Sequence, residues 1–280
     1  MFLVTGATGN VGSEVVGQLL AGGEKVRVFT RSAAKVSRWG NRVEVALGDF
    51  TQPETFVQAA TGVDGIFLMN GAMANEQFRE VIAAAKRAGA PRIVFMSSLA
   101  TSMPESAIGK LHKLQEDALR DSGLPHIVLR PGGFMSNTYQ WIGPLKSDGV
   151  VYNPMGTGRS APIAPEDIAA VAVKVLREPV TPGEVLELTG GELSTVAEQV
   201  RTLSEVLRRE VRCVDVPTEV AVQNFIRSGL PPAMAAAVGQ TIEAVRNGRT
   251  VQKTDTVDRI VGRPPMTFAA WLTKHAARFA

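Results

Sequence analysis

Short apolar runs recur along the first half of the chain, separated by stretches in which apolar residues follow helical spacing. The runs predict strands, because they are rich in branched and aromatic side chains and end at glycine or polar residues. We predict strands at 1–5, 25–30, 43–47, 65–69, 92–96 and 125–130, and helices at 13–20, 53–60, 74–87 and 107–122. This alternation predicts an α/β fold with a doubly wound parallel sheet, whose strands are buried on both faces.

The second half of the chain has a looser pattern. It predicts a helix at 165–177, a strand at 185–188, a helix at 195–208, strand-like alternation at 211–216 and one helix on each side of Pro231. With 280 residues the chain suits one large unit. We expect 1–134 to form the sheet core, and 135–280 to form mostly a smaller, mainly helical C-terminal lobe, interleaved with the core, that closes over the strand ends.

A glycine-rich turn joins the first predicted strand to the first helix. Gly6 permits a tight reversal, Gly9 permits close approach of the backbone to a ligand, and Gly12 permits close helix packing. The free N–H groups of the following helical turn favour an anion, here the pyrophosphate of a dinucleotide. A plain strand–helix turn is the alternative. The residues expected to bind the cofactor here are Gly6, Thr8, Gly9, Asn10, Val11 and Gly12.

The end of the second predicted strand carries positive charge. Such a position meets the adenosine ribose, where an acid selects a free 2′-hydroxyl and an Arg accommodates a 2′-phosphate. The chain places Arg31 and Lys35 there, with no acidic residue between Lys25 and Lys35. NADP(H) is therefore the expected cofactor, with NAD(H) as the alternative if both charges are ordinary surface residues.

Other predicted strand ends complete the expected cofactor site, because an open α/β sheet binds its ligand along this edge. Asp49 and Phe50 follow the third strand and are assigned to the edge and face of the adenine. The remaining candidates are Asn70, Gly71, Pro131 and Phe134.

Composition and charge exclude several classes of function. The formal net charge is +3, and the basic residues are scattered, which disfavours nucleic-acid binding. Cys213 is the only cysteine, so no intramolecular disulfide can form, and we expect a small buried side chain and no metal site. No apolar run approaches the ~20 residues of a membrane helix, and the chain opens directly on a strand. We expect a cytoplasmic protein without membrane partners, whose oligomeric state the sequence leaves open.

Several stretches together resemble the NmrA-like atypical short-chain dehydrogenases. The stretches are 6–12, Arg31, 48–49, 129–137, 165–169, 187–191 and 262–265. The resemblance covers nearly the whole chain and implies a Rossmann-like fold with an NADP-preferring site. It also implies a family that combines NADPH-dependent reductases of quinones, azo compounds and polycyclic ketones with cofactor-sensing regulators that do no chemistry.

The usual proton donor of short-chain dehydrogenases is missing. Those enzymes carry a Tyr four residues before a Lys, so that the phenol protonates the substrate oxygen. Here Tyr139 and Tyr152 are followed at that distance by Gly143 and Gly156. Quinones, azo groups and ketones flanked by phenols tolerate this loss, because the developing charge is delocalised or internally hydrogen-bonded.

Polar candidates for the chemistry lie after the fifth strand and on the helix that follows. Ser97 follows the strand, and His112 and Lys113 lie on the helix, with His112 four residues before Glu116. His112 is expected to donate a hydrogen bond to the substrate, as neutral imidazole or in its protonated form. The alternatives are that His112 packs at the strand–helix junction and that Ser97 satisfies backbone groups.

Methionine and aromatic side chains gather near predicted strand ends. Flexible thioethers and flat rings suit a large planar substrate, although core packing explains any one of them alone. The wall comprises Met69 and Phe134 together with the substrate-binding candidates Met73, Met103, Met135, Trp141 and Met155. We therefore predict an NADPH-dependent oxidoreductase that reduces a quinone or an aromatic or polycyclic ketone. The alternative is a non-catalytic regulatory protein that senses NADP(H).

Overall fold

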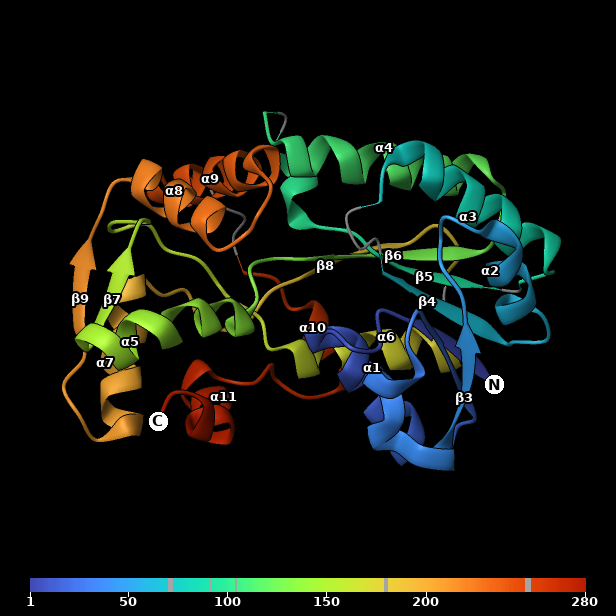
Figure 1. Ribbon diagram of the computed structural model, residues 1–280, viewed down its shortest axis with the longest axis horizontal. Helices are drawn as coiled ribbons and strands as arrows, with labels where there is room; N and C mark the ends of the chain where they lie inside the picture. Colours follow the sequence, from blue (N-terminus) through green and yellow to red (C-terminus); the bar gives the residue numbers. More distant parts are fainter. Residues whose placement is uncertain (70–72, 91, 104, 179–180, 250–252) are drawn as a thin grey trace.

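A seven-stranded sheet forms the centre of the computed structural model, which describes residues 1–69, 73–90, 92–103, 105–178, 181–249 and 253–280. The strand order is β3-β2-β1-β4-β5-β6-β8, and every pairing is parallel (Figure 1). The strands are β1 (Phe2–Thr5), β2 (Val26–Thr30), β3 (Val43–Leu47), β4 (Gly65–Met69), β5 (Ile93–Met96), β6 (His126–Pro131) and β8 (Val185–Leu188). The predicted doubly wound class is confirmed.

Helices cover both faces of this sheet (Figure 1). One layer contains α1 (Asn10–Ala21), α6 (Pro165–Arg177) and α10 (Thr256–Val261), and the other contains α2 (Pro53–Ala60), α3 (Asn75–Arg87) and α4 (Ala107–Asp121). Successive side chains of a strand enter opposite layers, so that Phe67 packs with the first layer and Ile66 and Leu68 with the second. Two apolar cores therefore hold the strand ends in place.

A second lobe lies beside the carboxyl ends of the strands (Figure 1). It contains a two-stranded parallel sheet, β7 (Val150–Asn153) with β9 (Arg212–Asp215). Its helices are α5 (Ile142–Asp148), α7 (Val196–Leu207), α8 (Thr218–Arg227), α9 (Pro232–Arg246) and α11 (Phe268–His275), and short 3₁₀ segments lie at Met135–Trp141 and Ala276–Arg278. Cys213 on β9 is half-buried, and this burial raises the pKa of its thiol.

The first turn of α6 ties the two lobes together through Glu166. Gln18 of α1 donates to the Glu166 carbonyl at 2.9 Å, inside the first lobe. From α11, Lys274 Nζ and His275 Nε2 lie 2.7 and 2.9 Å from Glu166 Oε1. Burial raises the pKa of Glu166, but the hydrogen bonds from Lys274 and His275 outweigh it, and the net shift is downward. Glu166 is therefore an ionised anchor for the C-terminal helix.

Asp167 anchors the segment before α11. Its Oδ2 accepts from the Met266 backbone N–H at 2.7 Å, and its Oδ1 lies 2.8 Å from Arg263 Nη1. Asp167 is fully buried, so these contacts neutralise a charge that water does not reach. Two of the stretches that carried the family resemblance, 165–169 and 262–265, thus meet in space.

None of the helices in the described ranges combines the length and the apolar character that crossing a bilayer requires. The same part of the chain holds no group of three or more His, Cys, Asp or Glu side chains placed to bind a metal ion.

Candidate active site

The strand order reverses between β1 and β4, and the two strands separate there. Backbone pairing ends at Val4 and Phe67. Beyond this pair the buried Thr5 hydroxyl takes over, donating to the Phe67 carbonyl at 3.2 Å and accepting from the Met69 N–H at 2.8 Å. A side chain between the strands holds their ends apart without leaving backbone groups unpaired. This opening is the crevice in which doubly wound sheets bind their ligands.

The glycine turn between β1 and α1 depends on missing side chains. Gly6 has a φ of +64°, and a Cβ there would lie 2.8 Å from the Met69 Cγ. A Cβ on Gly12 would lie 2.2 Å from the Gly6 carbonyl oxygen, closer than any real contact. Gly9 donates its N–H to the Gly6 carbonyl at 2.9 Å. The sequence therefore builds a tight loop that larger residues would distort.

The N-terminus of α1 offers N–H groups to an anion. Gly9 precedes the helix in an extended conformation, and within the described ranges no side chain caps it. Thr8, Gly9 and Asn10 are exposed, whereas Val11 is buried and fixes the turn to the core. Uncapped N–H groups at the positive end of a helix suit the pyrophosphate of a dinucleotide. The residues present therefore fit the expected cofactor.

Arg31 and Asp49 lie together where the adenosine end of a dinucleotide is expected. Arg31 Nη1 is 3.9 Å from Asp49 Oδ2, and 81% of the Arg31 side chain is exposed. The Thr51 backbone N–H and hydroxyl both donate to Asp49 Oδ1 at 2.9 Å, which lowers the pKa of Asp49, with a smaller contribution from Arg31. Lys35 is exposed nearby in sequence, on the 3₁₀ segment Ala33–Arg42. This end presents one fixed carboxylate and a cation that extends into solvent.

Phe50, assigned to the adenine face, is part of an aromatic group. Its ring centroid lies 5.1 Å from that of Phe29 and 5.4 Å from that of Phe56. The ring is half-buried, so one side packs against the second core. The core contact holds Phe50 at the end of β3.

Ser97 takes part in a buried polar cluster that joins β5, α4 and β6. Its hydroxyl donates to Glu116 Oε1 at 2.5 Å. Arg130 Nε donates to the same oxygen at 2.9 Å, and Arg130 Nη2 donates to Glu116 Oε2 at 2.6 Å. The sequence prediction assigned no role to Glu116 or Arg130 in the site, although a charged residue within the apolar strand 125–130 signals a buried partner.

His112 lies one helical turn before Glu116 on α4. Burial lowers the pKa of His112 to about 4, and the negative charge of Glu116 opposes this shift only in part. Its ring centroid is 6.3 Å from that of Phe95. Lys113, in contrast, is half-exposed and forms an ion pair with Asp117 on the outer side of the helix. The structure brings Ser97 together with Glu116 and directs Lys113 into a separate surface pair.

The two tyrosines lie in the second lobe. The Tyr139 ring packs against Trp271 and Phe279, at centroid distances of 5.4 and 5.8 Å, and burial raises the pKa of its phenol. Tyr152 is exposed on β7. Neither phenol belongs to the Ser97 cluster.

The methionine and aromatic candidates separate into two groups. Met135 and Trp141 are buried in the core of the second lobe, only 2% and 6% exposed, with Met155 half-buried against them. Met73 is also buried, and its carbonyl accepts from Gln115 Nε2 at 2.9 Å. The other half-exposed candidates are Met69 at the end of β4, Phe134 shortly after β6, and Met103 after the 3₁₀ turn Leu99–Ser102.

The remaining cofactor candidates lie at the ends of β4 and β6. Pro131 is buried at the last position of β6, and Phe134 packs against the first core together with Met69. Asn70 and Gly71 lie outside the described residues.

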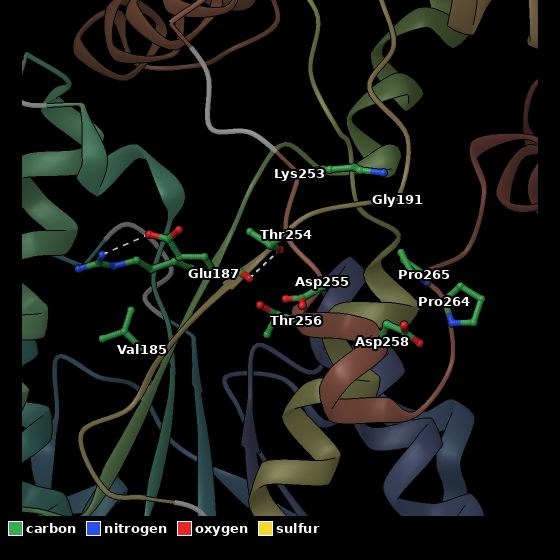
Figure 2. A pocket seen from close by; sticks show the side chains of 11 residues that line it. Val185, Glu187, Gly191, Lys253, Thr254, Asp255, Thr256, Asp258, Pro264 and Pro265 are labelled. Atoms are coloured by element: carbon green, nitrogen blue, oxygen red, sulfur yellow. Dashed lines mark hydrogen bonds and ion pairs between the residues drawn. The ribbon is translucent and has the colours of Figure 1, made fainter.

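A hollow of about 850 Å³ lies at the edge of the sheet that β8 forms, and Figure 2 shows the side chains that line it. Glu187 and Val185 of β8 line one side, and the segment from Lys253 to Asp258 lines another. Thr254 closes it by donating its hydroxyl to the Glu187 carbonyl at 3.0 Å. Arg130, a member of the Ser97 cluster, also lines this hollow, with Nη1 3.7 Å from Glu187 Oε1.

Comparisons with known proteins agree with this geometry. A family model described as NAD(P)H-binding matches residues 6–179. The chain is 36% identical to a (4-alkanoyl-5-oxo-2,5-dihydrofuran-3-yl)methyl phosphate reductase of Streptomyces griseus subsp. griseus, covering 100% of this chain and 99% of the relative. It is 33% identical to an NAD(P)H azoreductase of Xenophilus azovorans, again over 100% and 99%. The solved structure of an NADPH-dependent quinone oxidoreductase from Escherichia coli with NADPH matches at a TM-score of 0.87 and 25% identity, covering 99% of this chain and 100% of that chain.

Proposed function

Because this chain is a reductase that belongs to the NAD(P)H-binding, NmrA-like family of atypical short-chain dehydrogenases, we propose that it reduces a quinone or an aromatic or polycyclic ketone with NADPH. The observation that carries the proposal is the combination of the glycine turn at Gly6–Gly12 with the Ser97 cluster, which contains no phenol. Two full-length relatives named as reductases favour this function over the sensing of cofactor levels.

We assign the cofactor to the crevice between β1 and β4. The N–H groups at the start of α1 hold the pyrophosphate, Arg31 pairs with the 2′-phosphate, and Asp49 and Phe50 border the adenine. When bound, NADPH supplies the hydride, and the acceptor takes its balancing proton from solvent. The chain's own task is to orient the two reactants and to exclude water from between them.

His112 contributes as a neutral group in this proposal. Because burial lowers its pKa to about 4, the His112 imidazole is neutral at pH 7. The ring therefore acts through a hydrogen bond rather than as an acid. Lys113 has no assigned step, because its ammonium group is paired with Asp117.

Since the Ser97 cluster includes neither tyrosine and His112 is neutral, we expect a substrate that needs no strong proton donor. A quinone, or a ketone conjugated to a phenol, spreads the negative charge that hydride addition creates, so a strong proton donor is not required. The half-exposed Met69, Met103 and Phe134 provide flexible apolar contacts for such a flat molecule. Relatives named as azoreductase and quinone oxidoreductase act on acceptors of this kind, which supports the assignment.

A turnover assay tests the proposal. The absorbance of NADPH is followed with quinones, azo dyes and polycyclic ketones, each with and without the purified protein. We expect consumption with at least one conjugated acceptor, and a preference for NADPH over NADH. Tight NADPH binding without consumption in the whole panel would overturn the proposed reaction.

A further inference from the structure

The Ser97 hydroxyl is held in one orientation by its buried neighbours. Ser97 and Glu116 are only 4% and 7% exposed, so water does not compete for their contact. Two N–H groups of Arg130 point at the Glu116 carboxylate, one at each oxygen. In this bidentate pairing both Glu116 oxygens act as acceptors, which is the bonding pattern of a carboxylate.

The Glu116 carboxylate determines which hydrogen bonds Ser97 can form. A carboxylate only accepts hydrogen bonds, so the 2.5 Å contact uses the single hydroxyl proton of Ser97. The serine oxygen retains lone pairs and has no further proton to give. Ser97 therefore cannot stabilise negative charge on a substrate oxygen unless it first abandons Glu116.

Close packing enforces this arrangement. A Cβ on Gly109 would lie 2.0 Å from the Ala100 carbonyl oxygen, so the glycine lets α4 approach the turn that follows Ser97. The Ser97 backbone N–H donates to the Leu129 carbonyl at 2.8 Å, which fixes it to the strand that carries Arg130. Helix and sheet are thus locked at a spacing that brings Glu116 to Ser97.

We propose that Ser97 accepts a hydrogen bond from an N–H or O–H group of a bound ligand, and that Glu116, held by Arg130, is the positioning residue that sets this polarity. The inference rests on the proposed function, which places ligands at the carboxyl ends of the strands, where Ser97 lies directly after β5. Two sources have the required chemistry: the carboxamide of the nicotinamide, and a hydroxyl group on the acceptor.

Paired ligands distinguish the two sources. The first arm measures the Kd of NADPH and of its 3-acetylpyridine analogue, in which a methyl ketone replaces the carboxamide. The second arm measures kcat/KM for a hydroxyaryl ketone and for its O-methyl ether. In the first arm the ratio is the Kd of the analogue divided by the Kd of NADPH, and in the second it is kcat/KM of the hydroxyaryl ketone divided by that of its ether. Each ratio reports the hydrogen bond, because a general loss of structure raises both Kd values, or lowers both kcat/KM values, alike.

Ser97→Ala is expected to reduce the ratio about fivefold to tenfold in one of the two arms, the size of a lost hydrogen bond. Ser102→Ala is the matched control, since the Ser102 hydroxyl donates to the Leu99 carbonyl within its own 3₁₀ turn. In Glu116→Gln the new amide N–H can donate to the Ser97 oxygen, and the Ser97 hydroxyl proton is then no longer held by residue 116. The oxygen is less available as an acceptor for the ligand, so the same ratio should fall. Glu116→Asp keeps the charge and should retain the ratio even where both values decline.

Unchanged ratios in both arms for Ser97→Ala would overturn the inference. This holds even if Glu116→Gln fails to fold, because Ser97→Ala removes only one hydroxyl. The proposed function fails in a different way, by an absence of NADPH consumption in the wild type. The first arm measures binding without turnover, so the two failures remain distinct.

Discussion

The glycine turn at Gly6–Gly12 and the entry to the second lobe at Met135–Trp141 border the same candidate site but are built differently. In the glycine turn the backbone is fixed by its own contacts, and a single added carbon at Gly12 would lie 2.2 Å from an oxygen. In the lobe entry, Met135 and Trp141 are held by side chains of an apolar core. The glycine turn therefore depends on the absence of side chains, whereas the lobe entry depends on the packing of large apolar side chains.

The largest expected effect is on the second lobe. Trp141→Ala should lower the free energy of unfolding by about 3–5 kcal/mol, because it empties a large buried volume. Chemical denaturation measures this loss. A selective loss of activity at unchanged stability would instead make Trp141 a wall of the substrate site, and would break the contrast between the two regions.

Gly12→Val should weaken NADPH binding at least about a hundredfold, because the added side chain displaces the Gly6 carbonyl and distorts the turn. A fluorescence titration with NADPH measures the affinity. Gly17→Ala on the same helix is the control: a Cβ there meets nothing within 4 Å, so this variant should bind normally and gain about 0.5–1 kcal/mol of stability. Normal binding by Gly12→Val would contradict the placement of the cofactor.

Glu166 joins the two regions, and its removal sharpens the comparison. Its pKa is lower in the folded chain, so its ion pairs stabilise the fold above the unfolded value near 4.5, and this contribution is lost as the pH falls below it. Glu166→Gln should cost about 1–2 kcal/mol at pH 7, since Lys274 is half-exposed, and much less at pH 3. Unfolding curves at the two pH values test this. An equal loss at both would show that packing, not charge, holds α11.

The smallest expected effect is at the exposed end of the cofactor site. Arg31→Ala should reduce the preference for NADPH over NADH about tenfold, because it removes the exposed guanidinium that we propose pairs with the 2′-phosphate. The ratio of the two Kd values measures this. Arg38→Ala serves as a control, because Arg38 stacks on Trp39 at 4.3 Å. An unchanged ratio in Arg31→Ala would remove Arg31 from cofactor selection.

The sequence predicted best where local rules decide the structure. The helices at Pro53–Ala60 and Pro165–Arg177 match their predicted bounds, because a proline starts each and apolar spacing is regular. Helix α1 begins at Asn10, earlier than the predicted Ser13, because Gly12 is required by packing and does not interrupt the helix. Short strands with distant partners, such as β7, were not predicted, since Val150–Asn153 pairs only with Arg212–Asp215.

The polar site shows the same limit. Ser97 and His112 could be singled out by type and position, but the role of Ser97 depends on Arg130, which lies 33 residues further along the chain and reaches it through Glu116. No local sequence pattern predicts that the side chains of Ser97, Glu116 and Arg130 lie together. The interior position of Met135 and Trp141 likewise follows from a core to which α11 contributes from the far end of the sequence.

One hydrogen bond spans the boundary between the two regions: Asn10 Nδ2 donates to Ser136 Oγ at 3.2 Å. Asn10 opens the helix to whose N-terminus we assign the pyrophosphate, and Ser136 belongs to the first segment of the second lobe. A ligand that displaces Asn10 when it binds at the glycine turn would therefore also break a contact of the second lobe.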